Sequence, residues 1–225
     1  MTVLTVLNST CCRLIKMPWL FSTPLLIAAQ PHYNRCPNGA ASAAITAVQR
    51  FWVKARQKGI IAYQATDFEL PQHKEITHEL LMERAKLHWE RWGVQGKEFF
   101  SGAELYRCQD NFGLAAFLLH QSVEGTLKAL IQAILGYRVQ MHNLSKLLRI
   151  ALLFTDDLKS VFNLDTTEGE QMFTLLQTSY SQSRYSNEFN PDGKSVLALS
   201  KTVKKMITVA GKIYLQYAGK KGKDV

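Results

Sequence analysis

One long apolar stripe in the middle of the chain constrains its fold more than any other feature. Between residues 112 and 134 the apolar side chains recur at intervals of three and four, which is the spacing of one helical face. The positions are Phe112, Ala115, Ala116, Leu119, Val123, Leu127, Leu130, Ile131 and Ile134. Gly136 is a typical helix stop. The pattern therefore predicts a buried helix over 111–135.

Three polar residues, His120, Glu124 and Lys128, are set beside this stripe. They are four residues apart, so they stack on one side of the helix, one turn above another. In a functional interpretation they bind a nucleotide or an RNA backbone, or support groups that do. In a structural one, Glu124 and Lys128 form an i,i+4 pair worth a few tenths of a kcal/mol, and His120 is a buried histidine with satisfied hydrogen bonds. Periodicity alone favours the structural interpretation.

The chain after residue 71 has a helical pattern almost throughout, and Pro191 is its only proline. Besides 111–135, helices are predicted at 75–110, 143–154, 167–180 and 194–218, with a turn or two at 156–162 and an irregular polar loop over 181–193. Five helices with short connections imply antiparallel neighbours. We therefore predict an all-α fold over 72–218, an antiparallel up-and-down bundle of four or five helices, followed by a basic tail at 219–225.

The first 71 residues are patterned less clearly. Residues 1–40 hold four of the six prolines and three of the four cysteines. This composition predicts an irregular or disordered segment that is not native to the fold. A helix is expected over 41–58, a short strand over 60–63 and a linker over 67–71. The bundle is thus expected to follow a poorly ordered or remnant α/β segment.

Charge and cysteine spacing exclude several classes of protein. Residues 1–74 carry eight Lys/Arg against two acids, 75–193 carry eleven against fifteen, and 194–225 carry eight lysines against Asp224. Basic ends attract polyanions such as nucleic acid, although a solvated lysine face is the simpler interpretation. The four cysteines form no CxxC pair, which argues against a zinc site or a disulfide framework. We expect reduced thiols, no metal, no cofactor and a cytoplasmic protein.

The apolar run at 17–30 is too short to span a bilayer, which needs about 20 apolar residues, and two prolines interrupt it. It resembles the core of a signal peptide, so secretion is the alternative to a cytoplasmic location. No membrane partner is predicted.

Two further motifs carry candidate chemistry. Asn143 can cap a helix that begins at Leu144, and His142 just before it could shuttle a proton. Capping is the simpler explanation. Arg184 stands between Tyr180 and Tyr185, where it could hold a phosphate while a ring stacks on a base. Alternatively Arg184 ties down loop carbonyls or an acid such as Glu188.

These residues together resemble the HEPN domain family. His120-Gln-x-x-Glu124, Lys128-Ala-Leu, His142-Asn-Leu-x-x-Leu147 and Ser183-Arg184-Tyr185 follow the family's order and spacing over about residues 75–218. The resemblance implies a helical bundle that is often dimeric. In many bacterial members a nucleotidyltransferase domain precedes the bundle, and 54–63 looks like the closing helix and strand of such a domain. Residues 1–40 contain no acid, so the paired aspartates of that domain are missing and we expect a truncated or degenerate remnant over 41–71.

The resemblance also bears on activity. HEPN ribonucleases carry an arginine and a histidine separated by four to six residues, whereas Arg138 and His142 here are separated by three. We therefore favour a noncatalytic module, derived from a toxin–antitoxin-type system, that binds a nucleotide or RNA. Its expected binding residues are His120, Glu124, Lys128, His142, Arg184 and Tyr185. The alternatives are a ribonuclease with a contracted Arg138/His142 pair, and a helical module that pairs with a nucleotidyltransferase partner or forms a homodimer.

Overall fold

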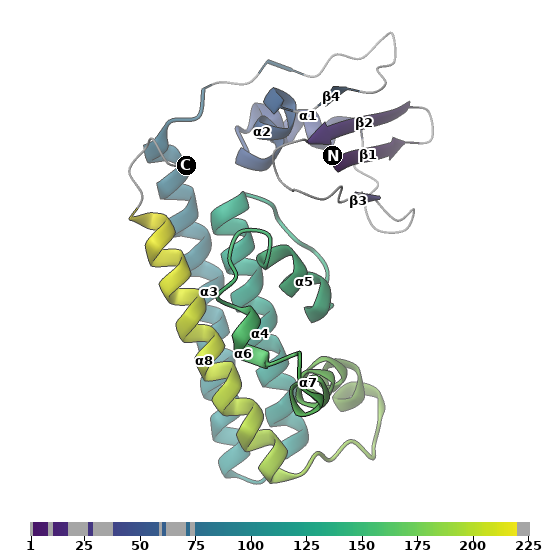
Figure 1. The fold of residues 1–225 in the computed structure, drawn as a ribbon, viewed down its shortest axis with the longest axis vertical. Helices are drawn as coiled ribbons and strands as arrows, with labels where there is room; N and C mark the ends of the chain where they lie inside the picture. The colour runs from purple at the N-terminus through teal and green to yellow at the C-terminus, as the bar shows by residue number, and fades with distance from the viewer. Residues whose placement is uncertain are drawn as a thin grey trace. The chain divides into compact units, whose positions relative to one another are not determined.

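The computed structural model of the 225-residue chain describes residues 2–8, 11–17, 27–28, 38–58, 60–61, 71–72 and 75–219. Two compact units are present (Figure 1). The first is Met1–Leu81 with Leu135–Tyr137, and the second is Met82–Ile134 with Arg138–Val225. The second unit holds most of the helical bundle and every candidate site residue named above.

The bundle is built from four long helices and two short ones within the described residues. They are α3 (His78–Cys108), α4 (Phe112–Leu135), α5 (Leu144–Ala151), α6 (Lys159–Phe162), α7 (Thr167–Tyr185) and α8 (Gly193–Ala218). The all-α bundle predicted from the sequence is therefore confirmed. In Figure 1, α3, α4 and α8 lie alongside one another, whereas α7 is seen nearly end-on.

Contacts between the long helices run in opposite residue order, as antiparallel packing requires. The ring of Trp89 in α3 stacks on Tyr214 in α8, with centroids 4.6 Å apart. Further along α3, Glu104 accepts a hydrogen bond from the hydroxyl of Ser200 in α8 (2.5 Å). Residue numbers thus rise along α3 as they fall along α8, so the two helices are antiparallel. The same reversed order relates α3 to α4, where His88 lies against Gln132 and, further along α3, the carbonyl of Gly96 accepts a hydrogen bond from Ser122 Oγ (2.7 Å).

The apolar stripe of α4 forms the centre of the core, as its period predicts. All of its members are buried except Phe112, which is half-buried. Buried side chains from the other helices close around it; they include Leu144, Leu147, Leu158, Leu176, Leu199, Val203 and Met206. Burial of this apolar area is the main stabilising contribution to the fold.

One helix ends later than the sequence predicted. We expected α7 to stop at 180 and an irregular loop to follow, but α7 continues to Tyr185. The Ser183 hydroxyl donates to the carbonyl of Ser179 (2.6 Å), and the backbone N–H of Ser186 donates to the carbonyl of Gln182. Residues 170–190 contain neither proline nor glycine, and polar composition alone did not end the helix at 180. Arg184 is consequently held on a helix.

The N-terminal unit contains strands where we predicted irregular chain. Strands β1 (Thr2–Asn8), β2 (Cys11–Met17), β3 (Ile27–Ala28) and β4 (Ile60–Ile61) form a sheet in the order β3-β1-β2-β4. β1 pairs with β2 antiparallel, from Thr2 opposite Met17 to Asn8 opposite Cys11, and β1 pairs with β3 in parallel. The prediction was wrong at 2–8 and 11–17, because the prolines and glycine lie outside these two runs and 2–8 is rich in β-branched residues.

The helix predicted over 41–58 is two helices, α1 (Asn38–Thr46) and α2 (Arg50–Lys58). They are separated at Val48, whose φ of 58° lies in the left-handed region and cannot continue a right-handed helix. β4 covers the first half of the strand expected at 60–63. The rest of that strand, most of the linker at 67–71 and the basic tail after Gly219 lie outside the described residues.

Gly96 allows the close approach of α3 to α4. A Cβ at this position would lie 2.5 Å from Thr126 Oγ1 and 3.1 Å from the carbonyl oxygen of Ser122. We expect Gly96→Ala to lower the unfolding free energy by about 1–3 kcal/mol, because the two helices must separate. Gly211 in α8 is the matched control, since a Cβ there meets nothing within 4 Å. Gly211→Ala should raise stability by about 0.5–1 kcal/mol.

Chemical denaturation of the two variants and the wild type measures this difference. Equal effects of the two substitutions would contradict the close packing of α3 on α4.

Candidate functional site

A buried carboxylate, Glu124 of α4, is the centre of the candidate site. Its residue is 7% exposed. Lys128 Nζ, one helical turn further along, donates to Glu124 Oε1 at 2.7 Å. His142 Nδ1, from just before α5, lies 3.0 and 3.1 Å from the two carboxylate oxygens. The line of polar residues predicted on α4 is therefore completed by a residue from another segment.

His120 lies on the inner side of this carboxylate and is 1% exposed. Its Nδ1 is 3.0 Å from the carbonyl oxygen of Leu176 in α7. A carbonyl only accepts hydrogen bonds, so Nδ1 carries a proton. Nε2 faces Glu124 Oε2 at 3.4 Å and stabilises the carboxylate when it carries a proton as well. His120 thus joins α4 to α7 and places its second nitrogen against the carboxylate.

Glu124 is held in its charged form. Burial of the carboxyl would raise its pKa, but His120, Lys128 and His142 together outweigh burial and lower the pKa to about 2. A charged carboxylate only accepts hydrogen bonds, so Nδ1 of His142 carries a proton. In the neutral imidazole, Nε2 of His142 then bears the lone pair.

The position of His142 is set by the start of α5. The Asn143 side chain accepts a hydrogen bond from the backbone N–H of Lys146 (2.9 Å) and caps the helix, as predicted. Ser145 donates to the side-chain oxygen of Gln177 in α7 through both its backbone N–H and its hydroxyl. The His142 side chain is 55% exposed. Its outer nitrogen is therefore accessible to a ligand while its inner nitrogen is fixed.

Tyr180 of α7 connects this cluster to Arg184. The His142 ring stacks on the Tyr180 ring, with centroids 5.3 Å apart and planes 14° apart. The Arg184 guanidinium lies 4.4 Å from the Tyr180 centroid and 5.2 Å from the Phe117 centroid, and its Nη1 donates to the Tyr180 hydroxyl (3.1 Å). Cation–π contacts of this kind hold a planar guanidinium in place.

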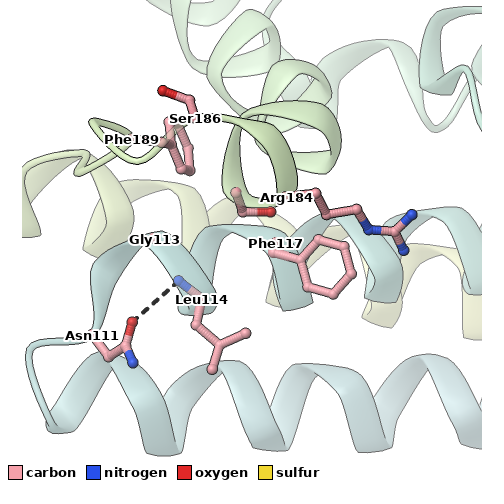
Figure 2. A pocket seen from close by; sticks show the side chains of 8 residues that line it. Asn111, Gly113, Leu114, Phe117, Arg184, Ser186 and Phe189 are labelled. Carbon is pink, nitrogen blue, oxygen red and sulfur yellow. Dashed lines mark hydrogen bonds between the residues drawn. The ribbon is translucent and has the colours of Figure 1, made fainter.

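An open hollow of about 380 Å³ adjoins Arg184, between the start of α4 and the end of α7. It is lined by Asn111, Gly113, Leu114, Phe117, Ser183, Arg184, Ser186 and Phe189. Figure 2 shows the Arg184 side chain extending from α7 beside the ring of Phe117, and the Asn111 side chain bonded to the backbone of Leu114. Two aromatic rings, two hydroxyls and a cation therefore surround one hollow.

The sequence-predicted residues fall into three groups. His120, Glu124, Lys128 and His142 form one cluster, and Arg184 reaches it through Tyr180. Tyr185 is 84% exposed. Arg138 is exposed and has no ion pair with the described residues, so nothing in this part of the chain holds it beside His142.

Sequence reasoning missed Phe117, Gln177 and Phe189. A signal existed only for Phe117, which is three residues before His120 and so lies on nearly the same side of α4. Gln177 and Phe189 contact the site through tertiary packing.

Comparison with known families decides the identity of this bundle. The model of the HEPN domain matches residues 89–215, more than half of the chain. The chain belongs to the HEPN domain family. The matched range of the HEPN domain contains every residue of the cluster, the Tyr180 stack and the hollow. Comparison with curated proteins finds no match.

Two further findings concern the described residues as a whole. No helix in the described part of the chain is long and apolar enough to cross a membrane. No group of three or more His, Cys, Asp or Glu side chains among the described residues could hold a metal ion.

Proposed function

We propose that this HEPN domain is a noncatalytic module that binds a nucleotide or RNA at the Tyr180 stack and the adjoining hollow. The observation that carries the proposal is Arg184. Its guanidinium is fixed over two rings and donates once to Tyr180, and its other N–H groups have no partner within the described residues. A guanidinium with free donors and a fixed plane suits bidentate contact with a phosphate.

The hollow supports the same conclusion. Its volume of about 380 Å³ lies in the range of small-ligand sites, about 300–1,000 Å³. Phe117 and Phe189 line the hollow, and a base that stacks on an aromatic ring gains about 1–3 kcal/mol. Ser186 adds a hydroxyl that can donate, whereas the Ser183 hydroxyl donates to the carbonyl of Ser179 within α7. A phosphate on Arg184 with its base against an aromatic wall is the arrangement we propose.

The buried cluster fixes the other side of the site. Glu124 holds Nδ1 of His142 and leaves Nε2 outward, where it can hydrogen-bond a ribose hydroxyl or a phosphate. Lys128 and His120 support Glu124 and are too buried to be primary contacts. We therefore assign ligand contact to Arg184 and His142, and positioning to His120, Glu124 and Lys128.

Binding of a short labelled RNA and of AMP, measured by anisotropy and calorimetry, tests this proposal. We expect Arg184→Ala to weaken binding about 10- to 100-fold, the loss of one charge-assisted contact of about 1.5–3 kcal/mol. Arg184→Lys should restore little, because lysine lacks the planar fork. Arg149→Ala, which changes an exposed arginine of α5, is the control. Absence of binding, or equal effects of Arg149→Ala and Arg184→Ala, would refute the proposal.

A ribonuclease is the second candidate, and one observation favours it. A carboxylate that orients an imidazole, with the far nitrogen directed outward, is the arrangement of a general base. The contracted Arg138/His142 pair remains its sequence basis. Cleavage of the RNA during the binding measurements, abolished in His142→Ala, would establish this function in place of the first.

Pairing with a nucleotidyltransferase domain or partner, a toxin–antitoxin origin and a homodimer remain proposals implied by family resemblance. The strands and helices of the N-terminal unit are compatible with a remnant of such a domain.

A further inference from the structure

The exposed side of α8 carries a straight line of lysines. Lys194, Lys201, Lys205 and Lys212 follow one another at seven, four and seven residues, so they share one side of the helix. All four are exposed. Their span of eighteen residues corresponds to about 27 Å at 1.5 Å per residue.

These four charges are not neutralised by the described residues. α8 contains no acid between Gly193 and Ala218. None of the four lysines forms an ion pair in this part of the chain, and Lys205 only donates to the carbonyl of Ser160 at 3.4 Å. By contrast Lys204, which lies off the line, acts on Glu104 of α3 and contributes to lowering the pKa of that carboxyl. The line therefore carries four positive charges that form no ion pair within the described residues.

The line begins beside the hollow. Gly193 at the start of α8 packs so closely on α4 that a Cβ there would lie 2.7 Å from the ring of Phe112. Gly113, which lines the hollow, would place a Cβ 3.0 Å from the carbonyl of Phe189. The intervening acid, Asp192, caps α8 by accepting from the backbone N–H groups of Lys194 and Ser195. A chain bound in the hollow could thus continue onto α8.

We propose that this lysine line is a track for the phosphate backbone of a single-stranded nucleic acid, so that the ligand is a polynucleotide and not a free nucleotide. The inference rests on the proposed function for the site at Arg184. A strand rises about 3.4 Å per nucleotide when stacked, so about eight nucleotides cover the 27 Å line. A regular row of single cations matches a linear polyanion, and the hollow supplies its starting point.

Affinity measured against oligonucleotide length and salt tests the track. The probes are single-stranded RNA of 3 and 14 nucleotides, DNA of the same lengths, and vesicles of anionic lipid. The track variant carries Lys201→Gln, Lys205→Gln and Lys212→Gln, and leaves out Lys194 because it adjoins the hollow. The charge-matched control carries Arg91→Gln, Lys97→Gln and Arg149→Gln, three exposed basic residues of α3 and α5 that form no ion pair with the described residues.

We expect the wild type to bind the 14-mer at least tenfold more tightly than the 3-mer. The track variant should lose about tenfold affinity for the 14-mer and keep its affinity for the 3-mer. Its plot of log affinity against log salt should be shallower by about 2, since each phosphate contact on a single strand contributes about 0.7. The control variant should change these values little. Comparison of the RNA and DNA probes shows whether binding depends on the 2′-hydroxyl of the sugar.

Equal affinities for the two lengths, equal losses in the track and control variants, or lysine-dependent binding of vesicles alone would overturn the track. Failure of the proposed site at Arg184 can be distinguished from failure of the track. If Arg184→Ala leaves binding of both lengths unchanged while the track variant weakens the 14-mer, the track stands without that site.

Discussion

Replacing Glu124 with alanine is expected to lower the unfolding free energy by about 3 kcal/mol, because the partly buried ammonium of Lys128 loses its partner and the His142 ring loses the acceptor that fixes it. Lys128 and His142 donate to this carboxylate, and the buried ring of His120 faces it. Glu98→Ala on the exposed side of α3 is the matched control and should change stability by less than about 0.5 kcal/mol. Urea unfolding of the two variants gives both values.

The same carboxylate makes stability depend on pH in a predictable direction. Its pKa in the folded protein, about 2, lies below the ordinary value of 4.5. The stabilisation is therefore complete above about pH 4.5 and is lost as the pH falls towards 2. Glu124→Gln should lack this part of the acid destabilisation. Glu79, Glu104 and Asp192 also have lowered pKa values, but they are present in both proteins and cancel in the difference.

A Glu124→Ala variant within 1 kcal/mol of the wild type, or a Glu124→Gln variant with the wild-type acid profile, would show that the cluster does not hold the bundle together.

Replacing Tyr180 with alanine should reduce stability and binding together. The ring lies against His142, His120 and Phe117 and supports the Arg184 guanidinium. We expect a loss of about 2–4 kcal/mol, somewhat below the value for a fully buried aromatic residue, because Tyr180 is half-buried. RNA binding should fall to the level of Arg184→Ala, since both contact residues lose the surface that positions them.

Two further variants separate the roles of the ring and the hydroxyl. Tyr180→Phe keeps the stack and removes only the hydrogen bond to Arg184, so its stability should fall by about 1 kcal/mol or less. Tyr185→Ala alters an 84% exposed ring and should leave stability unchanged, and its effect on binding tests whether Tyr185 belongs to the site. If Tyr180→Phe loses as much stability as Tyr180→Ala, the stack is not what positions Arg184.

Periodicity predicted the long helices because each one buries an apolar face of its own. The stripe of α4 and the inward positions of α8 need no knowledge of their neighbours. The end of α7 and the break at Val48 could not be predicted in this way. Polar residues such as Ser183 fit either a helix or a loop, and no rule of composition places a valine in the left-handed region.

The same distinction between local and tertiary information applies to the candidate site. Sequence alone determined that His120, Glu124 and Lys128 share one side of a helix and that Asn143 caps the next helix, because these depend on spacing within short segments. The HEPN-type bundle followed from the resemblance to that family. Only the tertiary structure decided that His142 bonds to Glu124, that Tyr180 joins this pair to Arg184, and that Phe117 and Phe189 border one hollow. Those contacts join residues from α4, α5 and α7 that are far apart in the chain, and they form only when the apolar faces of the helices pack together.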